Sequence, residues 1–133
     1  MAAGGFPRAV MDGDMTGARP NGEAVFLYTT WPDADSAAVA GAAIVGDRLA
    51  ACVNILPAMR SIYRWKGAVE TADEAVMIVK TLRSRVDAAI IAMKALHPYE
   101  TPAIVVMPLI GGSQPYLDWI AAESTPDGAE NEG

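Results

Sequence analysis

The hydrophobic positions at the start of the chain follow two different periods. Residues 24–30 form a short, nearly continuous apolar run rich in β-branched and aromatic side chains, which is typical of a buried strand. Small apolar residues then recur from Ala37 to Ile44 at the i, i+3, i+4, i+7 spacing of one helix face. Asp33 or Asp35 can accept hydrogen bonds from the free N–H groups at the start of that helix. The pattern therefore predicts a strand followed by a closely packed helix.

The next apolar segment predicts a long β-hairpin. Cys52 begins a strand that Pro57 interrupts, and a bulge or bend is expected there because proline has no N–H to donate to a ladder. The strand resumes after the proline, Lys66-Gly67 supplies a tight turn, and the return strand runs through residues 68–82. Both arms are longer than an average strand of about 5–6 residues. Such a hairpin presents unpaired edges.

The remaining pattern adds a helix, a strand and a last helix. Residues 86–93 carry one apolar helical face, and His97 ends that helix because the residue before a proline is disfavoured in the helical region. Residues 103–107 read as a strand, and residues 114–122 as a short helix with Ser113 as its candidate N-cap. The order up to the fourth strand is βαββαβ. This order predicts an α+β protein of the ferredoxin-like, split βαβ kind.

This topology has a consequence for assembly. Two βαβ crossovers place both larger helices on one face of the sheet, and the opposite face receives no helix of its own. The runs at residues 24–30 and 74–82 do not alternate cleanly, so several side chains on that opposite face should be apolar. A sheet that is apolar on both faces needs a second cover, and the long hairpin needs partners for its edges. The sequence therefore predicts an obligate homo-oligomer.

Length and composition set the domain organisation. The 133 residues are enough for one domain, which we place at residues 23–124. Residues 1–22 mix glycine, proline and isolated charges without an apolar period, and we expect a flexible N-terminal arm. Residues 125–133 are acidic with almost nothing to bury, and we expect a disordered tail.

Charge and cysteine content exclude several functions. The formal net charge is −6, and the few cations do not form a run, so nucleic-acid binding is not expected. No apolar run approaches the ~20 residues of a membrane span, and no secretory segment is visible. The single cysteine cannot form a disulfide within the chain, which favours a reducing compartment. We therefore expect a cytoplasmic protein.

Four motifs carry a family resemblance. They are residues 49–54 (LAACVN), 61–67 (SIYRWKG), 96–102 (LHPYETP) and 116–120 (YLDWI). In this order and spacing they resemble the CutA family, the divalent-cation tolerance proteins. The resemblance runs from about Ala24 to Ser124. It implies a ferredoxin-like fold similar to the PII signalling proteins, assembled as a tight homotrimer in which the long hairpin pairs with neighbouring chains.

The resemblance also implies a metal link. It suggests copper or another divalent cation, with a cleft between subunits near the cysteine and histidine motifs. Cys52 and His97 match family positions implicated in metal binding, and Glu100 is a candidate oxygen donor. Two positions depart from the best metal-binding members: Thr29 stands where some carry a cysteine, and Leu96 where some carry a second histidine. A weak site that draws ligands from more than one chain is the expectation.

Each candidate residue also has a plainer structural interpretation. His97 suits the C-terminal end of a helix, where an imidazolium interacts favourably with the helix dipole. Cys52 suits a small buried strand residue. Nothing local in the sequence activates the Cys52 thiol, because no helix N-terminus or adjacent cation lies beside it. We therefore expect no enzymatic activity.

A small-molecule cleft is the alternative function. Tyr63, Trp65, Lys80 and Tyr99 lie close to strand ends and could line a site between subunits. The two hairpin aromatics, Tyr63 and Trp65, also suit an oligomer core, and Lys80 suits a salt bridge. The sequence therefore favours a homotrimeric divalent-cation tolerance protein, with a PII-like small-molecule sensor or scaffold as the alternative.

Overall fold

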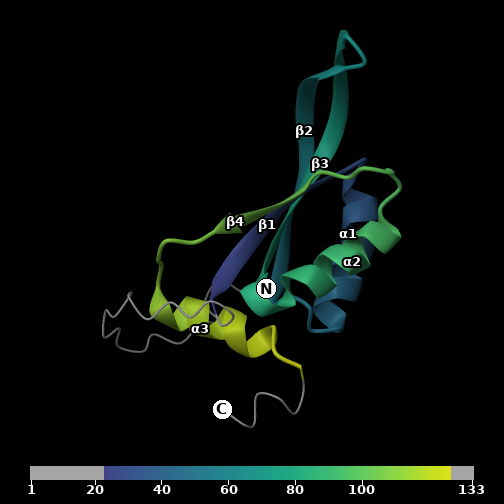
Figure 1. The fold of residues 1–133 in the computed structure, drawn as a ribbon. Coiled ribbons are helices and arrows are strands. Elements are labelled where there is room, and N and C mark those ends of the chain that lie inside the picture. The colour runs from purple at the N-terminus through teal and green to yellow at the C-terminus, as the bar shows by residue number, and fades with distance from the viewer. Residues whose placement is uncertain (1–22, 127–133) are drawn as a thin grey trace.

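The computed structural model describes residues 23–126. The arm expected at residues 1–22 and most of the tail expected at 125–133 lie outside the described residues. Within these residues, three helices and four strands follow one another in the expected order, with one short 3₁₀ turn (Figure 1). The elements are β1 (Ala24–Trp31), α1 (Ala34–Gly46), β2 (Cys52–Trp65), β3 (Ala68–Leu82), η2 (Arg83–Arg85), α2 (Val86–Leu96), β4 (Ile104–Pro108) and α3 (Gln114–Glu123).

The four strands form one antiparallel sheet in the order β2-β3-β1-β4. Strands β2 and β4 are therefore its two edges. The ladder between β2 and β3 shifts its register between Leu56 and Met59, which confirms the bulge expected at Pro57. At the hairpin tip Lys66 and Gly67 have φ values of 51° and 83°, as a tight two-residue hairpin turn requires. Beyond the bulge the hairpin projects from the rest of the molecule (Figure 1).

Helix α1 begins and packs as its sequence predicts. The Asp33 carboxylate accepts a hydrogen bond from the Ser36 N–H at 2.8 Å, so Asp33, and not Asp35, is the N-cap. The buried face of α1 carries only small residues and Ile44, which lets the helix lie close to the sheet. A Cβ atom on Gly41 would lie 2.7 Å from Cγ2 of Val53 on β2. The helix therefore rests against the strand with almost no space between them.

The main core lies between the sheet and the two larger helices. Odd-numbered residues of β1 and β3 point into it, and α1 and α2 cover them from one side, as the crossovers predict. The buried cluster consists of Val25, Leu27, Trp31, Ala37, Ala40, Ile44, Ala50, Met77, Val79, Ala89 and Met93.

The opposite face of the sheet is not bare. The expectation that it receives no helix is wrong, because α3 packs over one end of it. Ile120 is fully buried there in a second cluster that includes Ala24 and Ala51, with Phe26 and Cys52 packed against it. The order of elements did not predict this position, because α3 follows the last strand and belongs to no crossover. One end of the second face is thus covered within the chain.

The N-cap expected for α3 is also only partly right. Ser113 occupies the N-cap position, but its side chain makes no cap hydrogen bond. Pro115 lies in the first turn of the helix and has no N–H, which removes one of the two donors that a capping hydroxyl usually satisfies. The first turn is instead closed by the backbone, where Leu117 N–H donates to Ser113 O at 3.0 Å.

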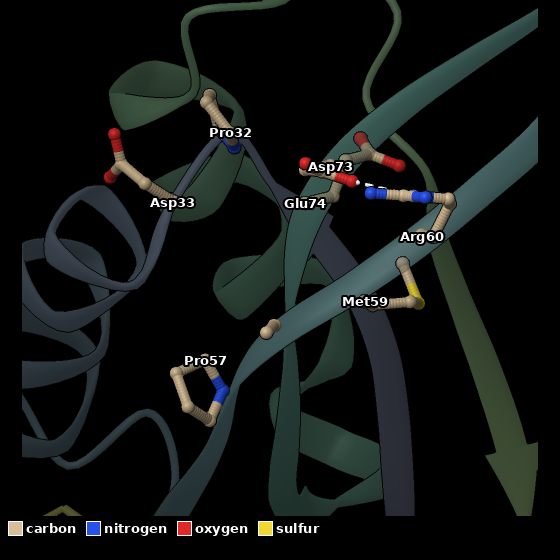
Figure 2. Close-up of a pocket in the computed structure, with 8 residues that line it drawn as sticks. Pro32, Asp33, Pro57, Met59, Arg60, Asp73 and Glu74 are labelled. Atoms are coloured by element: carbon tan, nitrogen blue, oxygen red, sulfur yellow. Dashed lines mark hydrogen bonds and ion pairs between the residues drawn. The ribbon is translucent and has the colours of Figure 1, made fainter.

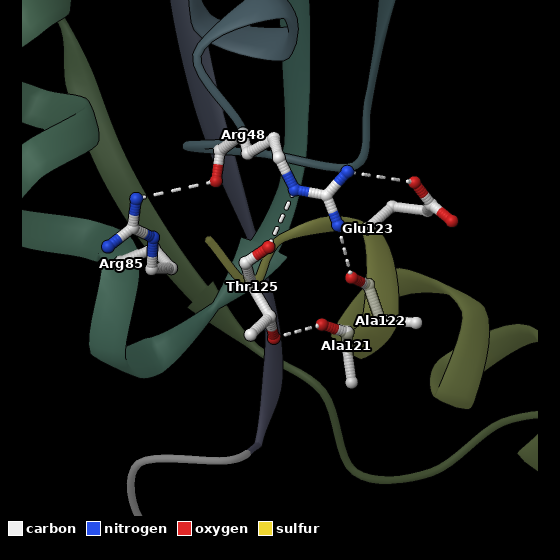
Figure 3. A network of polar contacts seen from close by, with 6 residues as sticks. All are labelled: Arg48, Arg85, Ala121, Ala122, Glu123 and Thr125. Carbon is white, nitrogen blue, oxygen red and sulfur yellow. Dashed lines mark hydrogen bonds and ion pairs between the residues drawn. The ribbon is translucent and has the colours of Figure 1, made fainter. Parts of the chain in front are cut away.

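An arginine holds the C-terminal end of α3 to the body (Figure 3). Arg48, in the loop after α1, has a φ of 58°. Its Nε donates to Thr125 O at 2.6 Å and its Nη2 to Ala122 O at 2.9 Å, so it satisfies carbonyls that the helix end leaves open. Its Nη1 lies 3.7 Å from the Glu123 carboxylate, and its own carbonyl accepts from Arg85 at 3.4 Å. Arg48 therefore anchors α3 across a long sequence separation.

The distal part of the hairpin buries little of its apolar surface within the chain. Ile62, Trp65 and Val69 are 71%, 55% and 64% exposed, although each is large and apolar. Val105 and Met107 on the edge strand β4 are also exposed. None of the described helices is long and apolar enough to cross a membrane.

Candidate functional site

The His97 imidazole is held on both sides by backbone groups. The ring is buried, its Nε2 lies 2.7 Å from Thr30 O, and its Nδ1 accepts from Tyr99 N–H at 3.1 Å. A carbonyl oxygen only accepts, so Nε2 must carry the hydrogen, and Nδ1 must offer its lone pair to Tyr99. His97 is therefore a neutral, fully bonded histidine that joins the end of α2 to β1. No lone pair of the ring is left for a metal in this arrangement.

Aromatic rings enclose the histidine. Its centroid is 4.2 Å from that of Trp31 and 4.9 Å from that of Tyr99. The Trp31 indole donates to the Thr29 hydroxyl at 2.7 Å, which in turn donates to Met77 O at 2.7 Å. Thr29, at the position where some family members carry a cysteine, thus has its hydroxyl committed to a buried hydrogen-bond chain. These hydrogen bonds and ring contacts join one end of β1 to β3 and to the residue that follows α2.

Cys52 lies at the other end of the sheet. It pairs with Lys80 on β3, which pairs with Phe26 on β1. Phe26 is four residues from Thr30, or about 13 Å along the strand at ~3.3 Å per residue. Cys52 and His97 are therefore not brought together within one chain. Glu100 is exposed in the loop after α2.

No metal centre is assembled by the part of the chain that is described. Among residues 23–126 there is no group of three or more histidine, cysteine, aspartate or glutamate side chains that could hold an ion. Divalent cations need several ligands at short distance. Cys52, His97 and Glu100 can therefore serve a shared metal only if a second chain completes the site.

Lys80 corrects a second expectation. The sequence showed no cation beside Cys52, but the ladder places Lys80 directly opposite it. The Lys80 ammonium donates to the Tyr116 hydroxyl at 2.9 Å and lies 5.3 Å from the ring centroids of both Phe26 and Tyr116. The salt bridge considered as the plainer role of Lys80 is not formed among the described residues. The Phe26 ring of β1 and the ring and hydroxyl of Tyr116 on α3 surround this cation instead.

The four residues predicted to line a ligand cleft separate into two places. Tyr63 pairs with Glu70, which lies ten residues from Lys80 along β3, or about 33 Å. Trp65 is still further away, at the hairpin tip. Tyr99 lies near enough to Tyr63 for the two to interact electrostatically. Burial raises the pKa of Tyr99 above the usual 10, and the charges of Glu74, Tyr63 and Asp33 raise it further. One chain therefore does not form the predicted cleft, but it does gather negative charge around Tyr99.

An open pocket lies at this acidic end, and sequence reasoning missed it (Figure 2). Its volume is about 540 Å³. Three segments far apart in the sequence form it: the junction between β1 and α1, the bulge in β2, and the facing part of β3. The available signals were the cap at Asp33 and the proline at the bulge. Its lining residues are Pro32, Asp33, Pro57, Ala58, Met59, Arg60, Asp73 and Glu74.

The antiparallel sheet, the three helices and the projecting hairpin define a small protein of the mixed α+β class. Residues 25–123 match the family model of the CutA1 divalent ion tolerance protein. A solved structure of CutA from Xylella fastidiosa superposes with a TM-score of 0.75 at 39% identity, covering 77% of this chain and 99% of that one. The chain therefore belongs to the CutA1 divalent ion tolerance family.

Curated relatives agree with this assignment. The divalent-cation tolerance protein CutA of Thermus thermophilus is 44% identical over 98 residues, which cover 74% of this chain and 94% of the relative. The chloroplastic CutA 1 of rice is 38% identical over 96 residues, which cover 72% of this chain. The match spans 54% of the rice protein, or about half its length.

Proposed function

We propose that this protein acts in divalent-cation tolerance, as a homotrimer that binds copper or a similar cation weakly at sites between subunits. Family membership over residues 25–123 carries the proposal. The relative from Thermus thermophilus bears the name of a divalent-cation tolerance protein. The role includes no catalytic step, and we propose that it is performed in the cytoplasm.

The proposed architecture is a ferredoxin-like protomer in a PII-like trimer. The strand order β2-β3-β1-β4 and the two crossovers that place α1 and α2 on one face support the ferredoxin-like assignment. The exposed apolar residues of the distal hairpin support assembly, because Ile62 and Val69 bury little within their own chain. The edge strand β4 adds exposed Val105 and Met107 beside unpaired backbone groups.

The proposed metal site lies between chains because one chain cannot complete it. Cys52 is half-buried, and Glu100 is exposed on a loop; each offers one donor of a type that divalent cations accept. His97 would join them only by giving up its bond to Thr30 O or to Tyr99 N–H. That exchange lowers the net affinity and fits a weak site.

Copper titration of the full chain tests the metal proposal. We expect Glu100→Gln and Cys52→Ser each to weaken copper binding measured by calorimetry, with circular dichroism unchanged. Glu70→Gln, which removes the same charge from the exposed distal hairpin, is the matched control. Equal affinities for all four proteins would contradict an inter-subunit site built on these residues.

The alternative is a PII-like trimer that senses a small molecule or serves as a scaffold. The open pocket of about 540 Å³ favours it, because that volume lies in the range of small-molecule sites. A thermal-shift screen with nucleotides, small acids and amines distinguishes the two functions. Stabilisation by an organic compound but not by copper would favour the sensor.

A further inference from the structure

The outward side of the helical layer is apolar at positions where a surface helix is normally polar. Helices α1 and α2 pack side by side on one face of the sheet (Figure 1). On the side turned away from the sheet, Val39 of α1 is 66% exposed and Ile91 of α2 is 70% exposed. Between Asp35 and Asp47, helix α1 carries no charged residue. An exposed apolar face of this kind marks an interaction surface.

Three exposed residues of α2 form one stripe along this face. Asp87 lies four residues before Ile91 and Lys94 three residues after it, so all three share one side of the helix. Neither charged side chain forms an ion pair among residues 23–126. Asp87 in the first turn and Lys94 in the last turn suit the helix dipole, but that role needs no apolar residue between them. The stripe therefore presents a negative, an apolar and a positive position in order.

The stripe is complementary to itself in one arrangement. When two copies of α2 lie antiparallel with Ile91 on a two-fold axis, Asp87 lies ~6.0 Å along the helix from that axis, at ~1.5 Å per residue. The partner's Lys94 lies ~4.5 Å from the axis in the same direction, so each Asp87 faces a lysine and the two Ile91 side chains meet. Ala88 and Ala95 flank Ile91 on its other side and are small enough for a close helix–helix approach. A two-fold interface requires this kind of self-complementarity.

We propose that the outward face of α2, together with the adjoining face of α1, binds the same face of a second copy of this protein. A second copy fits the stripe because the stripe carries one charge of each sign. Helix α1 has 13 residues, so the face is about 20 Å long, and two helices of ~10 Å diameter make it about 20 Å wide. The two copies together would bury roughly 800 Å², less than the about 1,200 Å² of a standard interface. The association is therefore weak and depends on concentration.

Sedimentation equilibrium of the full-length protein over a range of concentrations tests the proposal. We expect the mean mass of the wild type to rise with concentration. Asp87→Lys and Lys94→Asp should each weaken the association about tenfold, because both facing pairs change from attraction to repulsion. Ile91→Asp should abolish detectable association, and circular dichroism should show that every variant is folded, since all three positions are exposed. Equal masses for the wild type and these variants at every concentration would overturn the proposal.

A mixture of the two charge variants gives the sharpest result. When Asp87→Lys protein meets Lys94→Asp protein, every facing pair again joins opposite charges, so the association should return to within about twofold of wild type. Both variants keep a net negative charge, since each substitution changes the formal charge of −6 by two, so overall attraction cannot cause the recovery. The matched control mixes Lys94→Asp with Asp118→Lys, which reverses an exposed charge on α3. Equal recovery in both mixtures would contradict a specific two-fold contact.

The two proposed association surfaces can be tested separately. The trimer proposed from the distal hairpin uses other residues, so Ile62→Asp should lower the starting mass but retain the rise with concentration that Asp87→Lys reduces. If the chain is not a trimer, that rise begins at 13.9 kDa, and the effect of the charge variants is the same. A constant wild-type mass, with binding to phosphatidylcholine vesicles that Ile91→Asp removes, would assign the face to a membrane and overturn the proposal.

Discussion

The two halves of the β2–β3 hairpin share one ladder but have opposite surroundings. In the proximal half, Met77 and Val79 of β3 are fully buried beneath α1 and α2. In the distal half, Ile62 and Val69 carry the same kind of side chain into solvent. An isolated two-stranded ribbon is at best marginally stable in water. The difference teaches that this chain stabilises only half of its hairpin, and that the other half is suited to contacts with further chains.

The largest expected effect lies in the proximal half. Met77→Ala removes a fully buried side chain between the sheet and α1, and we expect a loss of about 2–5 kcal/mol in the free energy of unfolding. Val39→Ala, at an exposed position of α1 away from the hairpin, should change it by less than about 0.5 kcal/mol. Urea unfolding at one fixed protein concentration measures both. Similar losses for the two variants would remove the basis of the comparison.

Gly41 tests the packing of the proximal half of the hairpin against α1. In Gly41→Ala the new methyl group meets Val53 Cγ2 at 2.7 Å and Met77 Sδ at 3.1 Å, and overpacking should cost about 1–3 kcal/mol. Gly46→Ala, in the same helix with nothing within 4 Å of the added atom, should be neutral or stabilising by up to about 1 kcal/mol. The difference between their thermal midpoints is the measurement. Equal midpoints would mean that α1 does not rest on β2 as closely as described.

Near the boundary between the two halves, Tyr99 makes the stability of the protein depend on pH. Burial, Glu74, Tyr63 and Asp33 raise the pKa of Tyr99 above 10. The folded state therefore holds this proton more tightly than the unfolded state, so the stability contribution is complete below pH 10 and declines as the pH rises above it. An absorbance titration of the four tyrosines should lose its most alkaline step in Tyr99→Phe. Glu74→Gln should move that step towards pH 10; no movement would separate Tyr99 from the pocket.

The Asp33 cap gives the smallest effect. Its pKa is lowered by the Ser36 hydrogen bond, so its contribution is present above the unfolded value of 3.8 and is lost as the pH falls through the lower folded value. Asp33→Ala should lower the thermal midpoint at pH 7 more than at pH 3. Asp33→Ser should recover part of the loss because serine also caps. Equal shifts at both pH values would contradict an ionised cap.

Local sequence patterns predicted the helices and strands, whereas the register between paired strands became known only from the structure. The helix period from Ala37 to Ile44, the bulge at Pro57 and the end of α2 before Pro98 follow from local chemistry. The residue that pairs with Cys52 on β3 does not follow from local chemistry. The distal register, in which Trp65 pairs with Ala68, would place Cys52 opposite Thr81 if it continued unchanged, but the shift at the bulge places it opposite Lys80. One inserted residue thus decides that Lys80, and not Thr81, lies opposite Cys52.

Longer-range features were beyond sequence reasoning for a related reason. At the second face, Arg48 binds Ala122 O near the end of α3 and Thr125 O just beyond it, from a loop that lies far earlier in the chain. The His97 ring faces a strand carbonyl instead of solvent because the chain turns sharply after α2. Only the folded chain brings these partners together. The candidate metal residues were recognised by type, but their separation within one chain was not.

The mass of the protein in solution tests the central claim most directly. If the distal hairpin is an association surface, light scattering after size exclusion should give a particle of three chains of 13.9 kDa each. Ile62→Asp, which places a charge on that exposed surface, should reduce the mass while circular dichroism of the protomer is retained. A wild-type particle of 13.9 kDa that persists on concentration would contradict the account.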